Sequence, residues 1–137
     1  MTRIGAAYGA DSHTFLTLAG VGDLFLTCSS PTSRNYTVGY RLGKGENLDD
    51  IIRTLGSVAE GVTTAKALNV LIHKLGVRAP IATAIYEVLY EGTDLKTQAQ
   101  ELMARPSKIE LDLPSPTKNG PLSVLQRKLG LTDTVSS

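Results

Sequence analysis

From Leu48 onward the apolar residues of this chain recur at helical spacing, and almost no stretch alternates apolar and polar residues as a half-buried strand does. The run begins with Leu48, Ile51, Ile52 and Leu55. Glycine and proline interrupt the pattern where helices commonly end and begin. The spacing predicts an all-α fold, and a length of 137 residues suits a single multi-helix domain.

Capping residues and apolar stripes divide the chain into expected helices. These cover about 12–18, a segment starting near 23, a segment from about 35 to the glycine turn at 43–45, and then 60–75, 80–92 and 94–105. Residues 1–105 are expected to form the helical domain. Residues 106–137 are expected to form a tail rich in proline and serine, with a short helix at about 121–129.

Composition excludes several classes of function. The formal net charge is only +1 and the charges are interspersed, which argues against a nucleic-acid surface. No apolar run is long enough to cross a bilayer. The single cysteine, Cys28, favours a cytoplasmic location and, among apolar neighbours, is expected in the core. His13 and His73 have no partners at metal-ligand spacing, so no metal site is expected.

The segment Ala19–Asn35, AGVGDLFLTCSSPTSRN, carries the first candidate site residues. Asp23 follows a glycine-rich turn that lets the backbone approach a ligand or another helix closely. Its carboxylate suits a ligand hydroxyl or a catalytic cation. The alternative is that Asp23 only caps the helix that follows, and both roles are compatible.

Ser33, Arg34 and Asn35 have the outline of a phosphate site. A guanidinium can form two hydrogen bonds with phosphate oxygens, and the free N–H groups at a helix start add further donors. The alternative is a solvated arginine beside an ordinary cap. Glu60 begins the longest expected helix, where a glutamate commonly interacts with first-turn N–H groups rather than with a ligand.

Four motifs together resemble one known family. They are LAGVGDLFLTCSSPTSRN ending at Asn35, LGKG at 42–45, SVAEGV at 57–62 and GVRAPI at 76–81. Their order and spacing are similar to those of the NAD(P)-dependent glycerol-3-phosphate dehydrogenases. The resemblance extends to about Arg105 and covers the helical C-terminal substrate-binding domain of that family, which has a 6-phosphogluconate-dehydrogenase-like fold.

The resemblance implies an oxidoreductase that interconverts glycerol 3-phosphate and dihydroxyacetone phosphate with NAD or NADP. It implies substrate-binding roles for five residues and cofactor-binding roles for three. The substrate-binding residues would be Asp23, Thr27, Ser33, Arg34 and Asn35. The cofactor-binding residues would be Arg34, Val58 and Glu60. The family commonly dimerises, so the resemblance also implies a homodimer.

Two parts of the family pattern are missing. No G-x-G-x-x-G fingerprint is present, so no Rossmann domain is expected in this chain. The catalytic lysine of the family precedes the glycine-rich turn by more residues than stand before Gly20, and Lys44, Lys66 and Lys74 lie in other motifs. We therefore expect an inactive C-terminal part that needs a Rossmann domain in cis or in trans.

Two other classes of function stay open at this point. The chain could be a helical dimerisation module, with apolar helix faces shared between subunits. The segment Leu18–Leu24, with its glycine turn, also loosely resembles a helix-hairpin-helix DNA-binding motif. Its scarcity of basic residues argues against duplex binding.

Overall fold

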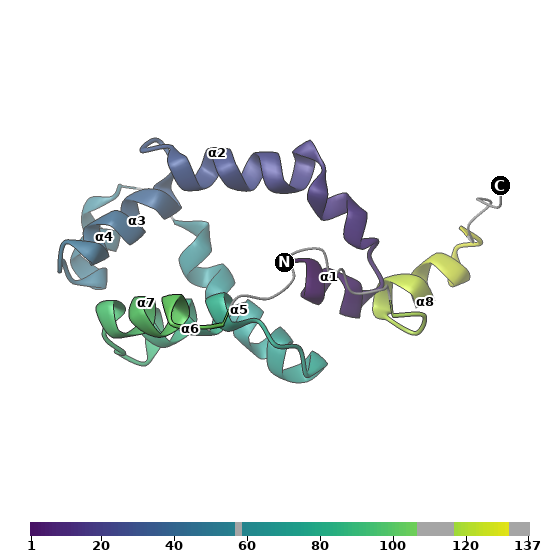
Figure 1. The fold of residues 1–137 in the computed structure, drawn as a ribbon. Coiled ribbons are helices and arrows are strands. Elements are labelled where there is room, and N and C mark those ends of the chain that lie inside the picture. Colours follow the sequence, from purple (N-terminus) through teal and green to yellow (C-terminus); the bar gives the residue numbers. More distant parts are fainter. Residues whose placement is uncertain (57–58, 107–116, 132–137) are drawn as a thin grey trace.

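The computed structural model describes residues 1–56, 59–106 and 117–131, and these residues form helices and connecting turns without a strand (Figure 1). The elements are α1 Thr2–Tyr8, the 3-10 helix η1 Ser12–Leu16, the π-helical turn η2 Leu18–Gly22, α2 Asp23–Ser29, α3 Arg34–Gly43, α4 Leu48–Thr54, α5 Glu60–Leu75, α6 Pro80–Tyr90, α7 Leu95–Met103 and α8 Pro121–Lys128. The predicted all-α fold is confirmed for these residues.

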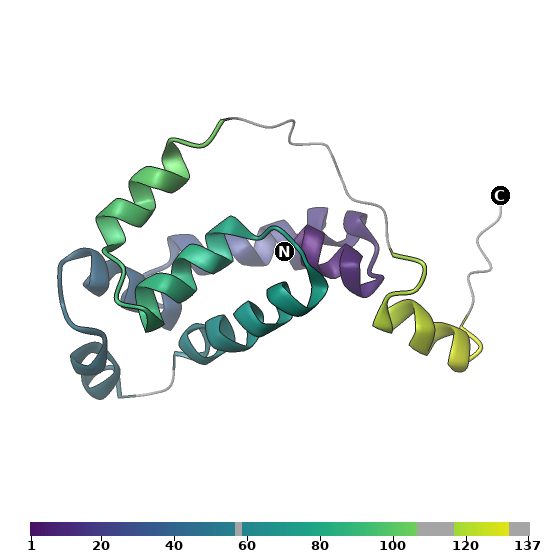
Figure 2. The same cartoon turned by 90° about the horizontal axis from the view of Figure 1, so that it is seen from below.

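Helices α5 and α6 form a hairpin at the centre of the molecule, and Figure 2 shows them side by side. Gly76 ends α5 in the left-handed conformation with φ of 61°, and Pro80 occupies the first turn of α6. At the other end of the hairpin the hydroxyl of Tyr90 donates to the carbonyl of Val62 at 2.7 Å. The start of α5 is thereby fixed against the end of α6.

A small apolar core joins α3 and α4 to the start of α5. Val38, Ile51 and Ala59 are buried there, and Ile51 has no exposed surface. Arg41 makes two hydrogen bonds at the outside of this region. Its Nε donates to Glu46 at 2.9 Å and its Nη1 donates to the Thr54 hydroxyl at 2.8 Å. This core sets where the N-termini of α3 and α5 lie.

Helix α8 packs against α1, which joins the two ends of the described chain (Figure 1). The N–H of Thr117 donates to the carbonyl of Ala6 at 2.9 Å. A Cβ built on Gly120 would lie 2.6 Å from the backbone carbon of Tyr8, so glycine permits this approach. The tail helix was predicted at about 121–129 and is observed, whereas the tail residues 107–116 lie outside the described residues.

The region before α3 departs from the sequence-based expectations. The helix expected at 12–18 is a short 3-10 helix followed by the π-helical turn η2, and α1 was not expected at all. Cys28 was expected in the core and is exposed, because no residue of α2 is buried. Phe25 is 70% exposed and Leu26 is 64% exposed. The described part of the chain therefore leaves the apolar side chains of α2 largely uncovered.

No described helix combines the length and hydropathy that a membrane span requires. Among the described residues, histidine, cysteine and carboxylate side chains nowhere gather in a group that could hold a metal ion.

Candidate functional site

The glycine-rich turn places Asp23 at the first position of α2. Gly20 is buried, and a Cβ built on it would lie 2.3 Å from the carbonyl oxygen of Phe15, so the backbone approaches here as only glycine allows. The Asp23 side chain is exposed, and the N-cap position of α2 is occupied by Gly22 rather than by Asp23. The capping alternative for Asp23 is therefore wrong, and its carboxylate is free within the described part of the chain.

Thr27 lies one helical turn after Asp23, on the same side of α2. Its hydroxyl donates to the backbone carbonyl of Asp23 at 2.8 Å. The side chain is half-buried. The hydroxyl proton is committed to the helix, so the Thr27 oxygen is left to accept a hydrogen bond from a ligand hydroxyl.

Ser33 and Arg34 form the start of α3. Ser33 is the N-cap, and its Oγ accepts from the backbone N–H of Tyr36 at 3.3 Å. Arg34 is exposed and, within the described residues, has no carboxylate partner. The guanidinium therefore stands free beside a helix N-terminus, where backbone N–H groups and the helix dipole favour an anion.

Asn35 joins the start of α3 to the start of α5. Its Oδ1 accepts from the backbone N–H of Gly61 at 3.0 Å. Glu60, the first residue of α5, is exposed and its carboxylate has no partner in the described part of the molecule. Two groups of residues predicted from separate motifs thus meet at one place. Val58, the remaining predicted cofactor-side residue, lies outside the described residues.

Gly61 is the residue here that sequence reasoning missed. A Cβ built on it would lie 2.6 Å from Oδ1 of Asn35, so the two helix starts approach closely. The sequence signal was a glycine placed directly inside a helix start, where it costs helix stability without serving as a cap. Its partner is 26 positions away, and spacing alone does not identify it.

Two cavities lie near the helix hairpin. One of about 410 Å³ is lined mainly by aliphatic side chains of α3, α5, α6 and α7, with Asn35 and Gly61 at its wall. An apolar cavity is costly for a phosphate ion. The exposed side of Asn35 next to Arg34 is therefore the better position for an anion.

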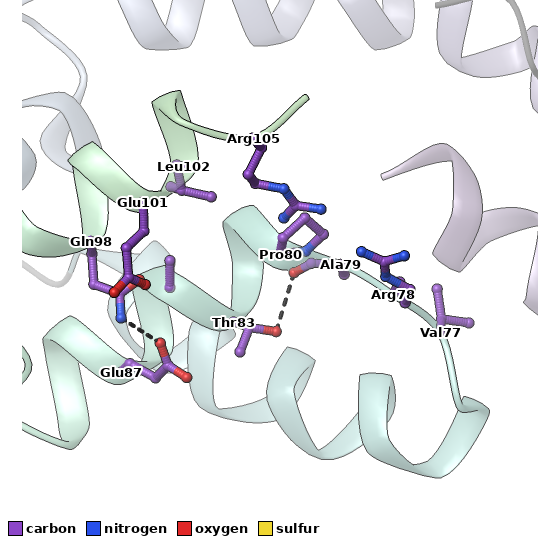
Figure 3. A pocket seen from close by; sticks show the side chains of 11 residues that line it. Val77, Arg78, Ala79, Pro80, Thr83, Glu87, Gln98, Glu101, Leu102 and Arg105 are labelled. Atoms are coloured by element: carbon purple, nitrogen blue, oxygen red, sulfur yellow. Dashed lines mark hydrogen bonds between the residues drawn. The ribbon is translucent and has the colours of Figure 1, made fainter. Parts of the chain in front are cut away.

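The second cavity, of about 390 Å³, lies between α6 and α7 (Figure 3). Arg78 and Arg105 stand at the end where α6 begins, and Glu87, Gln98 and Glu101 stand at the other end. Gln98 donates to the carboxylate of Glu87 at 2.7 Å. No residue predicted for the site lines this cavity, so it is separate from the cluster at the starts of α3 and α5.

Residues 1–100 match the family described as NAD-dependent glycerol-3-phosphate dehydrogenase C-terminus. The chain belongs to this family. The glycerol-3-phosphate dehydrogenase [NAD(P)+] of Geobacillus kaustophilus is 48% identical over 82% of this chain, and that of Levilactobacillus brevis is 46% identical over 80%. In each case the match covers 33% of the relative, so this chain spans about a third of the length of these glycerol-3-phosphate dehydrogenases.

A crystal structure from the same family has a similar fold. Glycerol-3-phosphate dehydrogenase from Coxiella burnetii superposes with a TM-score of 0.73 at 31% identity, covering 75% of this chain and 32% of that one. The predicted family membership, its oxidoreductase class and its NAD(P) dependence are thereby confirmed at the level of the family.

Proposed function

We propose that this chain is the C-terminal substrate-binding part of an enzyme that interconverts glycerol 3-phosphate and dihydroxyacetone phosphate. In the oxidative direction C2 of glycerol 3-phosphate would give up a hydride to the nicotinamide cofactor, and the proton of the C2 hydroxyl would pass to a base. The observation that carries the proposal is the Asn35–Gly61 hydrogen bond, which brings the phosphate-type cluster of α3 to Glu60 of α5.

The substrate side of the site would use residues of α2 and α3. Arg34 can form two charge-assisted hydrogen bonds with the phosphate, and Ser33 and Asn35 stand beside it at the helix start. Asp23 and Thr27 would line the reacting end. A carboxylate accepts hydrogen bonds only, so Asp23 suits a substrate hydroxyl or the ammonium group of a lysine supplied by another part of the enzyme.

The cofactor, NAD or NADP, would supply or accept the hydride. This chain offers it Arg34, Val58 and Glu60, of which Arg34 and Glu60 are exposed at neighbouring helix starts. A guanidinium suits a cofactor phosphate, and a carboxylate suits ribose hydroxyls. Most of the cofactor contacts would come from a Rossmann domain, in cis or in trans.

The proposal includes a cytoplasmic homodimer. The single cysteine fits a reducing compartment. Exposed apolar side chains on α2 and α8 offer surface for a second subunit or for the Rossmann domain. A helix-hairpin-helix module is not supported, because Gly22 and Asp23 are both right-handed helical and η2 continues into α2 without a hairpin.

The proposal can be tested by replacing the matched third of the Geobacillus kaustophilus enzyme with this chain. We expect the hybrid to oxidise NADH in the presence of dihydroxyacetone phosphate and the isolated chain to be inactive. Arg34→Ala in the hybrid should raise KM for dihydroxyacetone phosphate by about 10- to 100-fold, because charged hydrogen bonds are lost. Turnover by the isolated chain, or a hybrid that folds without turnover, would contradict the proposal.

A further inference from the structure

We propose that the backbone N–H of Gly61 determines which end of the Asn35 carboxamide faces the substrate phosphate, which makes Gly61 a positioning residue for the substrate. The inference rests on the function proposed above. It assigns a role to a residue without a side chain, through a hydrogen bond between two helix starts.

The hydrogen bond meets a need of α5. The first N–H groups of a helix have no partner within the helix. The N-cap of α5 is Ala59, which has no side chain that could accept from them. Asn35 supplies the missing acceptor from α3, with its Oδ1 at 3.0 Å from the N atom of Gly61.

The same bond fixes the orientation of the carboxamide. An asparagine side chain presents a carbonyl oxygen on one side and an NH₂ group with two donors on the other. The N–H group of Gly61 requires the oxygen on its side, so the Nδ2 NH₂ group is turned away from it. Within the described residues that NH₂ group donates to no other group, and Asn35 is exposed. Phosphate oxygens accept hydrogen bonds only, so the NH₂ group is the end that can bind them.

Glycine at position 61 is explained by this contact. Gly61 does not have positive φ, so its backbone conformation does not require glycine. A Cβ would lie 2.6 Å from Oδ1 and 2.9 Å from Cγ of Asn35 and would displace the carboxamide. The neighbouring Val62 is held by Tyr90 at 2.7 Å, so the start of α5 cannot easily move away.

The hydrogen bond itself can be tested in the full 137-residue chain without ligand. In a chain labelled with ¹⁵N and ¹³C, we expect a scalar coupling across the bond between the amide of Gly61 and the side-chain carbonyl of Asn35. We also expect slow exchange of the Gly61 amide proton, which Asn35→Ala should abolish. Rapid exchange in the wild type together with no coupling would overturn the inference.

The orientation can be tested by titrating the same chain with glycerol 3-phosphate, and with glycerol as a ligand that lacks phosphate. Only glycerol 3-phosphate should change the chemical shifts of the two protons on Nδ2 of Asn35. Gly61→Ala should weaken its binding roughly tenfold, as expected for a lost charge-assisted hydrogen bond. Gly39→Ala is the matched control, because a Cβ there has nothing within 4 Å. It should bind as the wild type does.

Asn35→Asp separates the two roles of the side chain. It keeps an acceptor for Gly61 and loses the donor, so the Gly61 amide should stay protected while glycerol 3-phosphate binding is lost. Two results would overturn this inference alone. One is that glycerol 3-phosphate changes the chemical shifts of Ser33 and Arg34 but not those of the Asn35 NH₂ group. The other is that a folded Gly61→Ala variant binds glycerol 3-phosphate as the wild type does. No binding by the wild type would contradict the proposed function and remove the inference with it.

Discussion

At the scale of single residues, the stability of the molecule depends on a few positions that are fully buried or tightly packed. Ile51 and Ile52 are neighbours on α4, yet Ile51 has no exposed surface and Ile52 is 44% exposed. Because both residues are isoleucine in the same helix, they have the same side chain and the same helix propensity, and the comparison isolates the effect of burial.

Ile51→Ala should lower the free energy of unfolding by about 2–5 kcal/mol, the usual cost of a buried large-to-small change. Ile52→Ala should cost clearly less, since its side chain loses little packing. Urea unfolding followed by circular dichroism gives both values. Equal losses for the two variants would mean that the α3–α4 core is not packed as described.

The sequence predicted the structural roles of some residues and missed those of others, and each outcome has a physical reason. Ser33 at the start of α3 and Gly76 at the end of α5 were found because caps leave local signals. The contact between Asn35 and Gly61 depends on how α3 packs against α5, which no local pattern carries. Cys28 was assigned to the core from its apolar neighbours, but α2 is not covered by the described residues.

At the scale of helices, α7 depends on a charged cap. Oδ2 of Asp94 accepts from the backbone N–H of Thr97 at 2.9 Å and from its hydroxyl at 3.0 Å. These hydrogen bonds hold the pKa of Asp94 below its ordinary value of 3.8. The folded pKa is lower than the unfolded one, so the cap stabilises α7 above the ordinary pKa and is lost as pH falls through the folded value.

We expect the ¹³Cα shifts of α7 to lose helical character in acid below about pH 4, the ordinary range of an aspartate. Asp94→Asn keeps a good neutral cap. It should therefore remove this pH dependence while α7 stays helical. Asp94→Ala should fray the first turn at every pH. Helix α6 is the internal control, because its cap residue Ala79 does not titrate. An identical acid profile in the wild type and in Asp94→Asn would contradict this assignment.

The sequence predicted α5, α6 and α7 well because each has its own stop and start signals. Gly76 and Pro80 separate the first two, and Asp94 begins the third. The segment before α2 was predicted as one helix at about 12–18. It is instead a 3-10 helix followed by a π-helical turn, because close packing around Gly20 rather than periodicity stabilises it.

At the scale of the whole molecule, the described residues leave the apolar side chains of α2 largely uncovered. Phe25 is 70% exposed and Leu26 is 64% exposed. Full burial of one such side chain is worth about 1.5–3 kcal/mol. The chain spans about a third of its relatives' length. Under the proposed function, a Rossmann domain or a second subunit would cover this surface.

Phe25→Glu should leave the helix content of the isolated chain unchanged, because the replaced ring packs on little within the described part. It should also reduce binding of a hydrophobic dye and any self-association seen by sedimentation. In the hybrid enzyme the same change should lower activity or thermal stability. Unfolding of the isolated chain by Phe25→Glu would show that α2 is already packed in this chain.

The pairing of α1 with α8 has a consequence for synthesis. It joins a helix near the start of the sequence to one near its end, through the bond between Thr117 and Ala6 and the close approach at Gly120. Contacts between distant positions form late, since the intervening chain must first be ordered. On the ribosome, α1 would lack its partner until the residues up to Lys128 had also been made, while the α5–α6 hairpin can close as soon as it emerges.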